Sequence, residues 1–283
     1  MRNWGLRARS ARNPQFRYHL PDPVMDERSL RKTLSGFPLG GLRTFEQAGS
    51  TNDAALAWAS EGAADWSLVY AEEQTSGRGR GGRRWFTPPE AALAFSLVLR
   101  PLPGEEQSVP LFSGLGAVAV CEALEMRGLQ PGIKWPNDVL LNRRKVCGIL
   151  AETVWLGDKV DSIVLGIGVN VRPEAVPSSG RLNFPATSVE AEMGRSVDRL
   201  VLLKDILQAL LRWRGLMLKA RFRSAWENRL AFCGEQVEIR AEGVPSRTGL
   251  VEGLERDGSL RLRSRDGQAF TVQFGEVHLR PVL

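Results

Sequence analysis

Residues 77–85 of this 283-residue chain read GRGRGGRRW, and this segment restricts what the chain can be more than any other. Glycines expose backbone N–H groups and let a ligand come close to the chain, while arginines supply forked donors for phosphate and carboxylate groups. Strand-like runs at 67–72 and 94–100 flank the segment. We therefore predict an anion-binding loop between two strands, too rich in glycine for regular structure and without the spacing of a Walker A loop.

The same segment has a second interpretation, a flexible RNA-binding stretch rich in arginine and glycine. Such stretches occur as several copies in low-complexity surroundings, whereas this chain has one copy between strand-like runs. The anion-binding loop is the favoured interpretation, and a nucleic-acid-binding protein remains the alternative from another class.

The composition limits the chemistry that can accompany this loop. The two histidines, His19 and His278, lie near opposite ends of the chain, which argues against a Ser-His-Asp triad or a histidine-rich metal centre. The three cysteines, Cys121, Cys147 and Cys233, lack C-x-x-C spacing, so we expect free thiols in a reducing cytoplasm. Membrane spans need about 18 consecutive apolar residues, and we expect a soluble protein without one.

The basic charge is concentrated at the start of the chain. Residues 1–24 hold five arginines against one aspartate and so supply +4 of the net charge of +6. We expect residues 1–28 to be a disordered tail. The remaining +2 does not indicate a basic surface for specific DNA binding.

Hydrophobic patterning after the tail predicts two domains. Alternating or apolar runs predict strands at 42–47, 67–72, 94–100, 132–135, 139–141, 146–155 and 162–171, and helical patterns cover 29–34, 50–59, 109–126 and 198–219. Ser50 and Asp53 have capping-box spacing at the start of the second helix. This order predicts an α+β catalytic domain at 29–232, with a mainly antiparallel sheet flanked by helices. Short strands separated by glycine turns predict a small β-barrel at 233–283.

Two further motifs place polar residues where strands end or weaken. Pro136 interrupts a strand just before Asn137 and Asp138, and the predicted hairpin brings Lys145 close to both. In the GIGVN run at 166–170, alternating glycines suit a strand that a ligand or another backbone approaches closely, and the amide of Asn170 can read an adenine edge. Ordinary turn chemistry, solvated surface charge and a tightly packed buried strand remain the simpler alternatives.

The start of the helix at Ser50 is a third candidate site. Its first N–H groups have no partner within the helix and suit a carbonyl or ureido oxygen. Simple helix capping is the alternative.

Taken in order along the chain, these motifs resemble the biotin–protein ligase family (biotin–[acetyl-CoA-carboxylase] ligase). The resemblance covers about residues 42–280 and includes the KWPND run at 134–138, ATS at 186–188 and GEV at 275–277. It implies a fold like that of class II synthetases and biotin ligases, with an SH3-like C-terminal barrel.

The resemblance implies a role for each matching residue. Biotin would be bound by Ser50, Thr51, Asn52, Gln74, Arg78, Gly79, Arg80 and Lys145. The nucleotide would be bound by Arg83, Trp85, Asn137 and Asn170, and Asp138 would help to place Mg²⁺. Arg80 and Lys145 are the expected catalytic residues, and the loop is expected to be mobile when empty and to close over the substrates.

The implied reaction activates biotin with ATP as biotinyl-5′-AMP and transfers it to a lysine of the biotin carboxyl carrier protein of acetyl-CoA carboxylase. About 40 residues precede the first motif, fewer than the DNA-binding winged-helix domain of some members requires. We therefore expect the monofunctional type, without specific DNA binding, as a monomer or weak homodimer. A lipoate–protein ligase is the nearest alternative.

Overall fold

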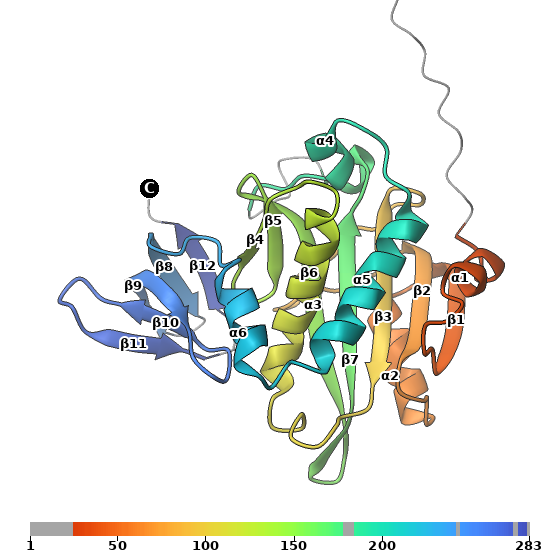
Figure 1. Ribbon diagram of the computed structural model, residues 1–283, viewed down its shortest axis with the longest axis horizontal. Coiled ribbons are helices and arrows are strands. Elements are labelled where there is room, and N and C mark those ends of the chain that lie inside the picture. Colours follow the sequence, from red (N-terminus) through yellow and green to blue (C-terminus); the bar gives the residue numbers. More distant parts are fainter. Residues whose placement is uncertain (1–24, 178–183, 242–243, 274–276, 282–283) are drawn as a thin grey trace, which may run out of the picture.

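The computed structural model describes residues 25–177, 184–241, 244–273 and 277–281, which form two sheets with helices (Figure 1). The larger sheet has seven strands, in the order β1 (Gly41–Ala48), β2 (Ser67–Gln74), β3 (Ala92–Leu99), β7 (Lys159–Asn170), β6 (Arg144–Leu156), β5 (Asp138–Leu141) and β4 (Pro131–Lys134). Only the β1–β2 pair is parallel among these described strands. The predicted α+β fold with a mainly antiparallel sheet is confirmed.

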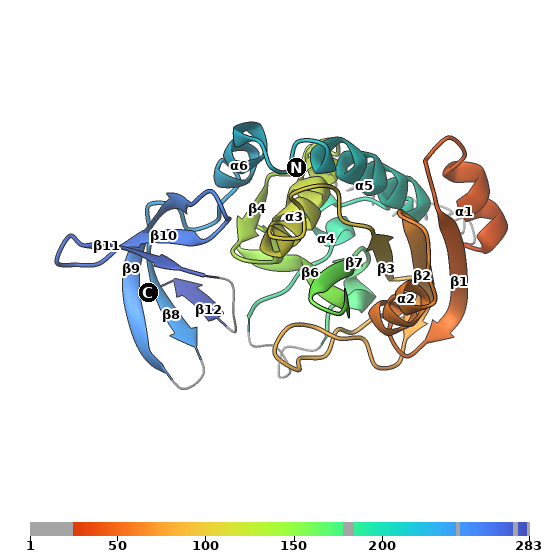
Figure 2. The same cartoon turned by 90° about the horizontal axis from the view of Figure 1, so that it is seen from below.

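Helices cover both faces of this sheet, as Figure 2 shows. The helices α3 (Val109–Glu125) and α5 (Arg199–Arg214) pack on one face, and α2 (Thr51–Ser60) packs on the other. Most side chains of α3 are buried because the helix is apolar on nearly every side. The helix predicted at 198–219 ends earlier, at Arg214, and a separate helix α6 (Ala220–Glu227) follows. Two short elements, η1 (Pro173–Ala175) and α4 (Val189–Met193), lie between β7 and α5.

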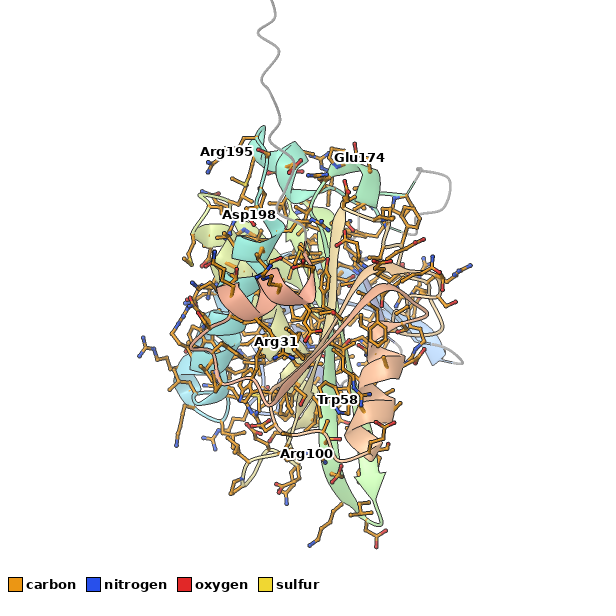
Figure 3. All side chains as sticks on the ribbon, turned by 90° about the vertical axis from the view of Figure 1, so that its right-hand side faces the viewer. Arg31, Trp58, Arg100, Glu174, Arg195 and Asp198 are labelled. Carbon is orange, nitrogen blue, oxygen red and sulfur yellow. The ribbon has the colours of Figure 1, made fainter. Side chains whose placement is uncertain are left out.

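The N-terminal boundary of the fold differs from the prediction. Helix α1 (Glu27–Thr33) begins within the expected tail, and the side chain of Asp26 accepts a hydrogen bond from the backbone N of Ser29 at 2.8 Å. Met25 is buried, so residues 25–28 belong to the fold, and residues 1–24 lie outside the described residues. In Figure 3, α1 with Arg31 and α2 with Trp58 lie on opposite sides of the sheet.

The start of α2 is held by a residue of the neighbouring strand rather than by a capping box. Ser50 is at the N-cap position in extended conformation, but its side chain makes no capping hydrogen bond. Instead, the backbone N of Thr51 donates to Oε1 of Gln74 at 2.8 Å, and Asp53 pairs with Arg78 at 2.7 Å. The predicted Ser50–Asp53 capping box is wrong, since the side chain of Ser50 makes no capping bond and the carboxylate of Asp53 pairs with Arg78.

The C-terminal part forms the second sheet. Its five strands are all antiparallel, in the order β11 (Ala269–Val272), β10 (Leu260–Arg263), β9 (Val244–Leu254), β8 (Gln236–Ala241) and β12 (Val277–Pro281). The small all-β unit is therefore confirmed. Since the described pairings leave β11 and β12 as the two edges, closure into an SH3-like barrel stays a prediction.

The two sheets share one hydrophobic core. The indole Nε1 of Trp135 donates to the backbone O of Gly258 at 3.0 Å, and a carboxylate oxygen of Glu227 accepts from the backbone N of Leu254 at 2.8 Å. Because core side chains run continuously between the parts, the boundary between domains at 232 and 233 stays a prediction. The predicted GEV motif is partly outside the described residues.

No helix of the described residues combines the length and apolarity that crossing a membrane would require.

A half-buried carboxylate, that of Glu72, joins β2 to the start of α5. Glu72 of β2 accepts from the Tyr70 hydroxyl at 2.5 Å, from Nη1 of Arg199 at 2.6 Å and from the backbone N of Glu90 at 2.6 Å. Burial would raise the pKa of Glu72, but the hydrogen bonds from Tyr70 and Arg199 outweigh it and lower the pKa. Ionised Glu72 therefore stabilises the fold above its unfolded pKa of about 4.3, and this contribution is lost as the pH falls below that value.

We expect Glu72→Gln to reduce the free energy of unfolding at pH 7 by about 2 kcal/mol, because the amide cannot accept all of these donors as the carboxylate does. The difference from wild type should shrink below about pH 4. Urea unfolding at pH 7 and at about pH 3 measures both effects, with Glu46→Gln, an exposed residue of β1, as the control. An unchanged pH dependence in Glu72→Gln would contradict the role of the ionised group.

Candidate active site

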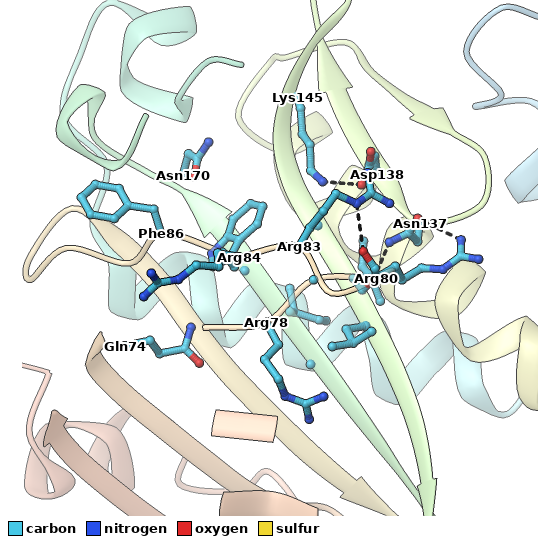
Figure 4. Close-up of a pocket in the computed structure, with 18 of the residues that line it drawn as sticks. Gln74, Arg78, Arg80, Arg83, Arg84, Phe86, Asn137, Asp138, Lys145 and Asn170 are labelled. Carbon is cyan, nitrogen blue, oxygen red and sulfur yellow. Dashed lines mark hydrogen bonds and ion pairs between the residues drawn. The ribbon is translucent and has the colours of Figure 1, made fainter. Parts of the chain in front are cut away.

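One cavity on the α2 face of the larger sheet contains every site residue that the sequence predicted. Its volume is about 610 Å³. The predicted residues that line it are Ser50, Thr51, Asn52, Gln74, Arg78, Gly79, Arg80, Arg83, Trp85, Asn137, Asp138, Lys145 and Asn170. Residues more than 100 positions apart in the chain thus meet in one place, and Figure 4 shows many of them around the cavity.

The segment 77–85, here called the arginine hairpin, forms one wall of the cavity (Figure 4). The backbone N of Gly79 donates to the O of Arg83 at 2.6 Å, and the N of Trp85 donates to the O of Gly77 at 2.8 Å. Gly81 and Gly82 form the turn with φ values of 61° and 66°, which glycine adopts without strain. As expected, the segment contains no helix or strand, and the glycine turn with one isolated bridge between Arg78 and Arg84 gives it the shape of a hairpin.

At one end of the cavity the start of α2 provides a buried polar group of side chains. This polar end consists of the buried Ser50, Thr51 and Asn52 together with the half-buried Gln74 of β2. The amide of Asn52 donates to Oε2 of Glu152 at 2.8 Å, and its Oδ1 accepts from the Ser96 hydroxyl at 2.6 Å. These bonds fix the amide, which suits recognition of a ligand by hydrogen bonds of defined direction.

The opposite end of the cavity is positively charged. This cationic end consists of Lys134, Lys145, Arg80 and Arg83, which surround the buried Asp138. Nζ of Lys145 lies 2.6 Å from Oδ1 of Asp138, as Figure 4 shows, and Nζ of Lys134 lies 3.4 Å from Oδ2. The predicted approach of Lys145 to Asp138 is confirmed. More cations than anions remain at this end, so it suits phosphate or carboxylate groups.

The charged groups at the cationic end change the pKa values of Asp138 and Lys134. Burial alone would raise the pKa of Asp138, but Lys145 and Lys134 outweigh it and lower the pKa. Burial lowers the pKa of Lys134, although Asp138 opposes this shift. The carboxylate therefore stays ionised between the two ammonium groups at neutral pH.

Two asparagines at the cavity also hold backbone segments together. Nδ2 of Asn137 donates to the O of Ile149 at 2.7 Å, and its Oδ1 accepts from Nη1 of Arg80 at 3.4 Å. Nδ2 of Asn170 donates to the O of Thr187 at 3.1 Å. Both side chains are thus held at the cavity wall by the strands and loops next to it.

The glycines of β6 and β7 make room for side chains. A Cβ on Gly168 would lie 2.4 Å from Nε1 of Trp85, and one on Gly148 would lie 3.0 Å from the same indole. The indole therefore packs flat against the two strands, and Nζ of Lys145 lies 5.3 Å from its ring centroid. Gly168 is closely approached, but by the side chain of Trp85 rather than by a ligand or backbone, which matches the alternative of a tightly packed strand.

Sequence reasoning missed two residues that organise the cavity, Glu152 and Ser96. The carboxylate of Glu152 accepts hydrogen bonds from both terminal nitrogens of Arg78, at 2.8 and 2.7 Å, and another from the amide of Asn52. Its position was detectable in principle, because residues at alternate positions of a strand share a face and Gly148 and Leu150 line the cavity. Ser96 carries no comparable signal, since it is a single serine in an otherwise apolar strand.

We expect Gly166→Ala to displace Asn52, because the new Cβ would lie 1.9 Å from its Oδ1 while hydrogen bonds hold the amide in place. The free energy of unfolding should fall by about 2 kcal/mol. Chemical denaturation measures the loss. Gly215→Ala is the matched control, since the nearest atom to its Cβ would be 3.9 Å away. Wild-type stability of Gly166→Ala would contradict the proposed packing.

Comparison with known proteins relates the whole chain to one protein family. The sequence profile of the Biotin/lipoate A/B protein ligase family matches residues 44–170. The biotin–[acetyl-CoA-carboxylase] ligase of Paracoccus denitrificans is 38% identical over 228 residues, which cover 77% of this chain and 92% of that protein. The ligase of the same name from Mycobacterium tuberculosis is 33% identical over 270 residues, covering 91% and 97%.

A solved structure agrees with these relatives. The biotin protein ligase from Aquifex aeolicus, in complex with biotin and ATP, superposes with a TM-score of 0.73 at 28% identity, covering 86% of this chain and 99% of that one. The fold, the order of the motifs and the level of identity therefore agree, and the chain belongs to the biotin protein ligases of the Biotin/lipoate A/B protein ligase family.

Proposed function

We propose that this chain is an ATP-dependent biotin protein ligase that attaches biotin to a lysine of the biotin carboxyl carrier protein of acetyl-CoA carboxylase. The observation that carries the proposal is the two-ended cavity. Its polar end at α2 suits the ureido ring of biotin, and its cationic end suits the carboxylate and the phosphates of ATP. The arginine hairpin lies along the cavity between the two ends.

The reaction has two balanced steps. A carboxylate oxygen of biotin attacks the α-phosphate of ATP, which forms biotinyl-5′-AMP and releases pyrophosphate. The amine of the acceptor lysine then attacks the acyl carbon, which forms an amide and releases AMP with loss of a proton. No side chain of the enzyme has to form a covalent intermediate.

The polar end binds biotin in this proposal. The side chain of Ser50 makes no capping bond, and the first residues of α2 line the cavity at this end. Thr51, Asn52 and Gln74 complete this end, and Arg78 and Gly79 of the hairpin cover it. Hydrogen bonds of fixed direction select the ureido group because a ligand without it would leave buried donors unpaired.

The cationic end stabilises the charge that develops during adenylate formation. Lys145 contacts both the biotin carboxylate and the α-phosphate, and Arg80 and Arg83 neutralise the phosphates. Both groups are held in position before reaction, since Lys145 is paired with Asp138 at 2.6 Å and Arg80 donates to Asn137 at 3.4 Å. Exclusion of water by the hairpin protects the mixed anhydride from hydrolysis.

The nucleotide occupies the wall formed by Trp85, Asn137 and Asn170, where an aromatic ring and two amides can contact a base. Mg²⁺ fits this site only together with the phosphates, because the described residues offer no cluster of three metal-binding side chains. Asp138 is the nearest carboxylate, and each of its oxygens already faces a lysine. When bound, the ion neutralises phosphate charge.

The remaining proposals concern the cellular compartment, the oligomeric state and DNA binding. Three free thiols fit a reducing cytoplasm, the compartment we propose. We further propose a monomer or weak homodimer that does not bind specific DNA sequences.

Transfer of label tests the proposal. The purified chain is incubated with ATP, Mg²⁺ and a biotin carboxyl carrier protein, with either labelled biotin or labelled lipoate. We expect label on the carrier from biotin only, and none when ATP is omitted. Transfer of lipoate instead would assign the chain to the lipoate ligases, and no transfer of either would overturn the proposed reaction.

A further inference from the structure

Glu152 of β6 connects two walls of the cavity. Its Oε2 accepts from Nδ2 of Asn52 at 2.8 Å, at the polar end. Both of its carboxylate oxygens accept from the guanidinium of Arg78, at 2.8 and 2.7 Å, in the arginine hairpin. One side chain of the central sheet thus holds the helix on one side and the hairpin on the other.

Glu152 is the stronger of the two carboxylates that contact Arg78. Asp53 contacts one nitrogen of the guanidinium at 2.7 Å, and its side chain is 57% exposed. Glu152 forms the two-pronged pair, and its side chain is 25% exposed. Paired bonds to a partly buried carboxylate are stronger and more directional than a single exposed ion pair. The position of Arg78 therefore depends mainly on Glu152.

The same hydrogen-bond network reaches the other end of the hairpin. The hydroxyl of Ser96 donates to Oδ1 of Asn52 at 2.6 Å, and its oxygen lies in hydrogen-bond contact with the hydroxyl of Thr51 at 2.8 Å. The backbone N of Thr51 donates to Gln74, whose Nε2 donates to the hydroxyl of Thr87 at 2.9 Å. Arg78 lies near the start of the hairpin and Thr87 follows its end, so both sides of the hairpin are tied to the start of α2.

We propose that Glu152 is a positioning residue that fixes the arginine hairpin against the biotin-binding end of the cavity and thereby retains the biotinyl-AMP intermediate. The inference rests on the proposed function. Glu152 acts through Arg78 rather than by touching the reacting atoms. Loss of the carboxylate charge frees the hairpin, and the intermediate then escapes or meets water before transfer.

Glu152→Gln separates this role from a role in folding. The amide oxygen can still accept from Asn52, whereas the ion pair with Arg78 is lost. We expect the half-life of enzyme-bound biotinyl-AMP to fall about tenfold or more, while the Kd for biotin changes by less than about threefold. The matched control is Glu235→Gln, which breaks a two-pronged pair with Arg143, at 2.8 and 2.9 Å, that does not line the cavity. The control should retain the intermediate as wild type does.

A double variant tests whether Glu152 acts through Arg78. If it does, combining Glu152→Gln with Arg78→Gln should shorten retention no further than the more severe single variant. Additive losses would show that the two residues act independently and would overturn the proposal.

Limited proteolysis provides a readout that does not need the reaction. Trypsin cleaves after arginine, and the hairpin contains Arg80, Arg83 and Arg84. In the ligand-free protein we expect cleavage between residues 80 and 85 to be about fivefold faster in Glu152→Gln than in wild type or Glu235→Gln. Arg78→Gln removes the Arg78–Glu152 ion pair by changing its more exposed partner, and it should accelerate cleavage by the same factor. This second variant keeps the test available if Glu152→Gln does not fold.

Wild-type cleavage rates in Glu152→Gln, or in Arg78→Gln where that variant replaces it, would overturn the positioning role. Failure of the proposed function has a different signature: wild-type protein would form no adenylate, while the cleavage rates would still report on the pair.

Discussion

Lys145→Ala is expected to slow the formation of biotinyl-AMP by about a thousandfold. The substitution removes the cation that contacts both reacting groups in the proposed mechanism. It also leaves the buried Asp138 with Lys134 as its remaining lysine partner, at 3.4 Å instead of 2.6 Å. Negative charge would then face the incoming carboxylate and phosphates with less compensation, which raises the barrier further.

Single-turnover measurements of adenylate formation, with excess enzyme over biotin, test this prediction. Lys159→Ala is the control because Lys159 is exposed at the start of β7. Thermal unfolding of each variant separates loss of chemistry from loss of fold. A folded Lys145→Ala protein with wild-type turnover would refute the catalytic role of Lys145.

Arg80→Ala is expected to have the second largest effect, with adenylate formation slowed by about a hundredfold or the adenylate released into solution. Nη1 of Arg80 donates to Oδ1 of Asn137 at 3.4 Å, which joins the tip of the hairpin to the β4–β5 turn (Figure 4). Removing the guanidinium therefore takes a charge from the phosphates and opens the hairpin at the cationic end.

Filtration of the reaction mixture separates bound from released biotinyl-AMP and tests this prediction. Arg265→Ala, in an exposed turn of the second sheet, is the control for loss of an arginine elsewhere. If Arg80→Ala forms adenylate at the wild-type rate and retains it, the role of Arg80 is wrong.

The strands were predictable because local periodicity determines them. The run predicted at 146–155 corresponds to β6 at Arg144–Leu156. The hairpin between β5 and β6 explains why Lys145 reaches Asp138. Alternation along a chain and short turns are local properties, so a sequence can reveal them. The same reasoning could not give the shared core of the two sheets, which depends on contacts such as Trp135 with Gly258, 123 positions apart.

The membership of the site was also predictable, but its internal contacts were not. The motifs identified the residues that line the cavity, while the roles assigned to them individually stay predictions. The Ser50–Asp53 capping box failed because Arg78, which lies outside α2, pairs with the carboxylate of Asp53. Glu152 was not predicted, because its role depends on hydrogen bonds with Arg78 and Asn52, which lie 74 and 100 positions away in the chain.

The glycines illustrate the same limit. Their pattern indicated close approach at β7, but not which group approaches. The structure shows that Asn52 packs against Gly166 and Trp85 against Gly168. The glycines therefore act indirectly, by seating the side chains that form the cavity walls.

The central claim is that this cavity makes and holds biotinyl-5′-AMP, and native mass spectrometry of the full chain with ATP, Mg²⁺ and biotin tests it most directly. We predict a protein complex heavier by the mass of one biotinyl-AMP, formed only when both ATP and biotin are present. Folded protein that carries no adenylate under these conditions, or that carries an adenylate only when lipoate replaces biotin, would contradict the claim.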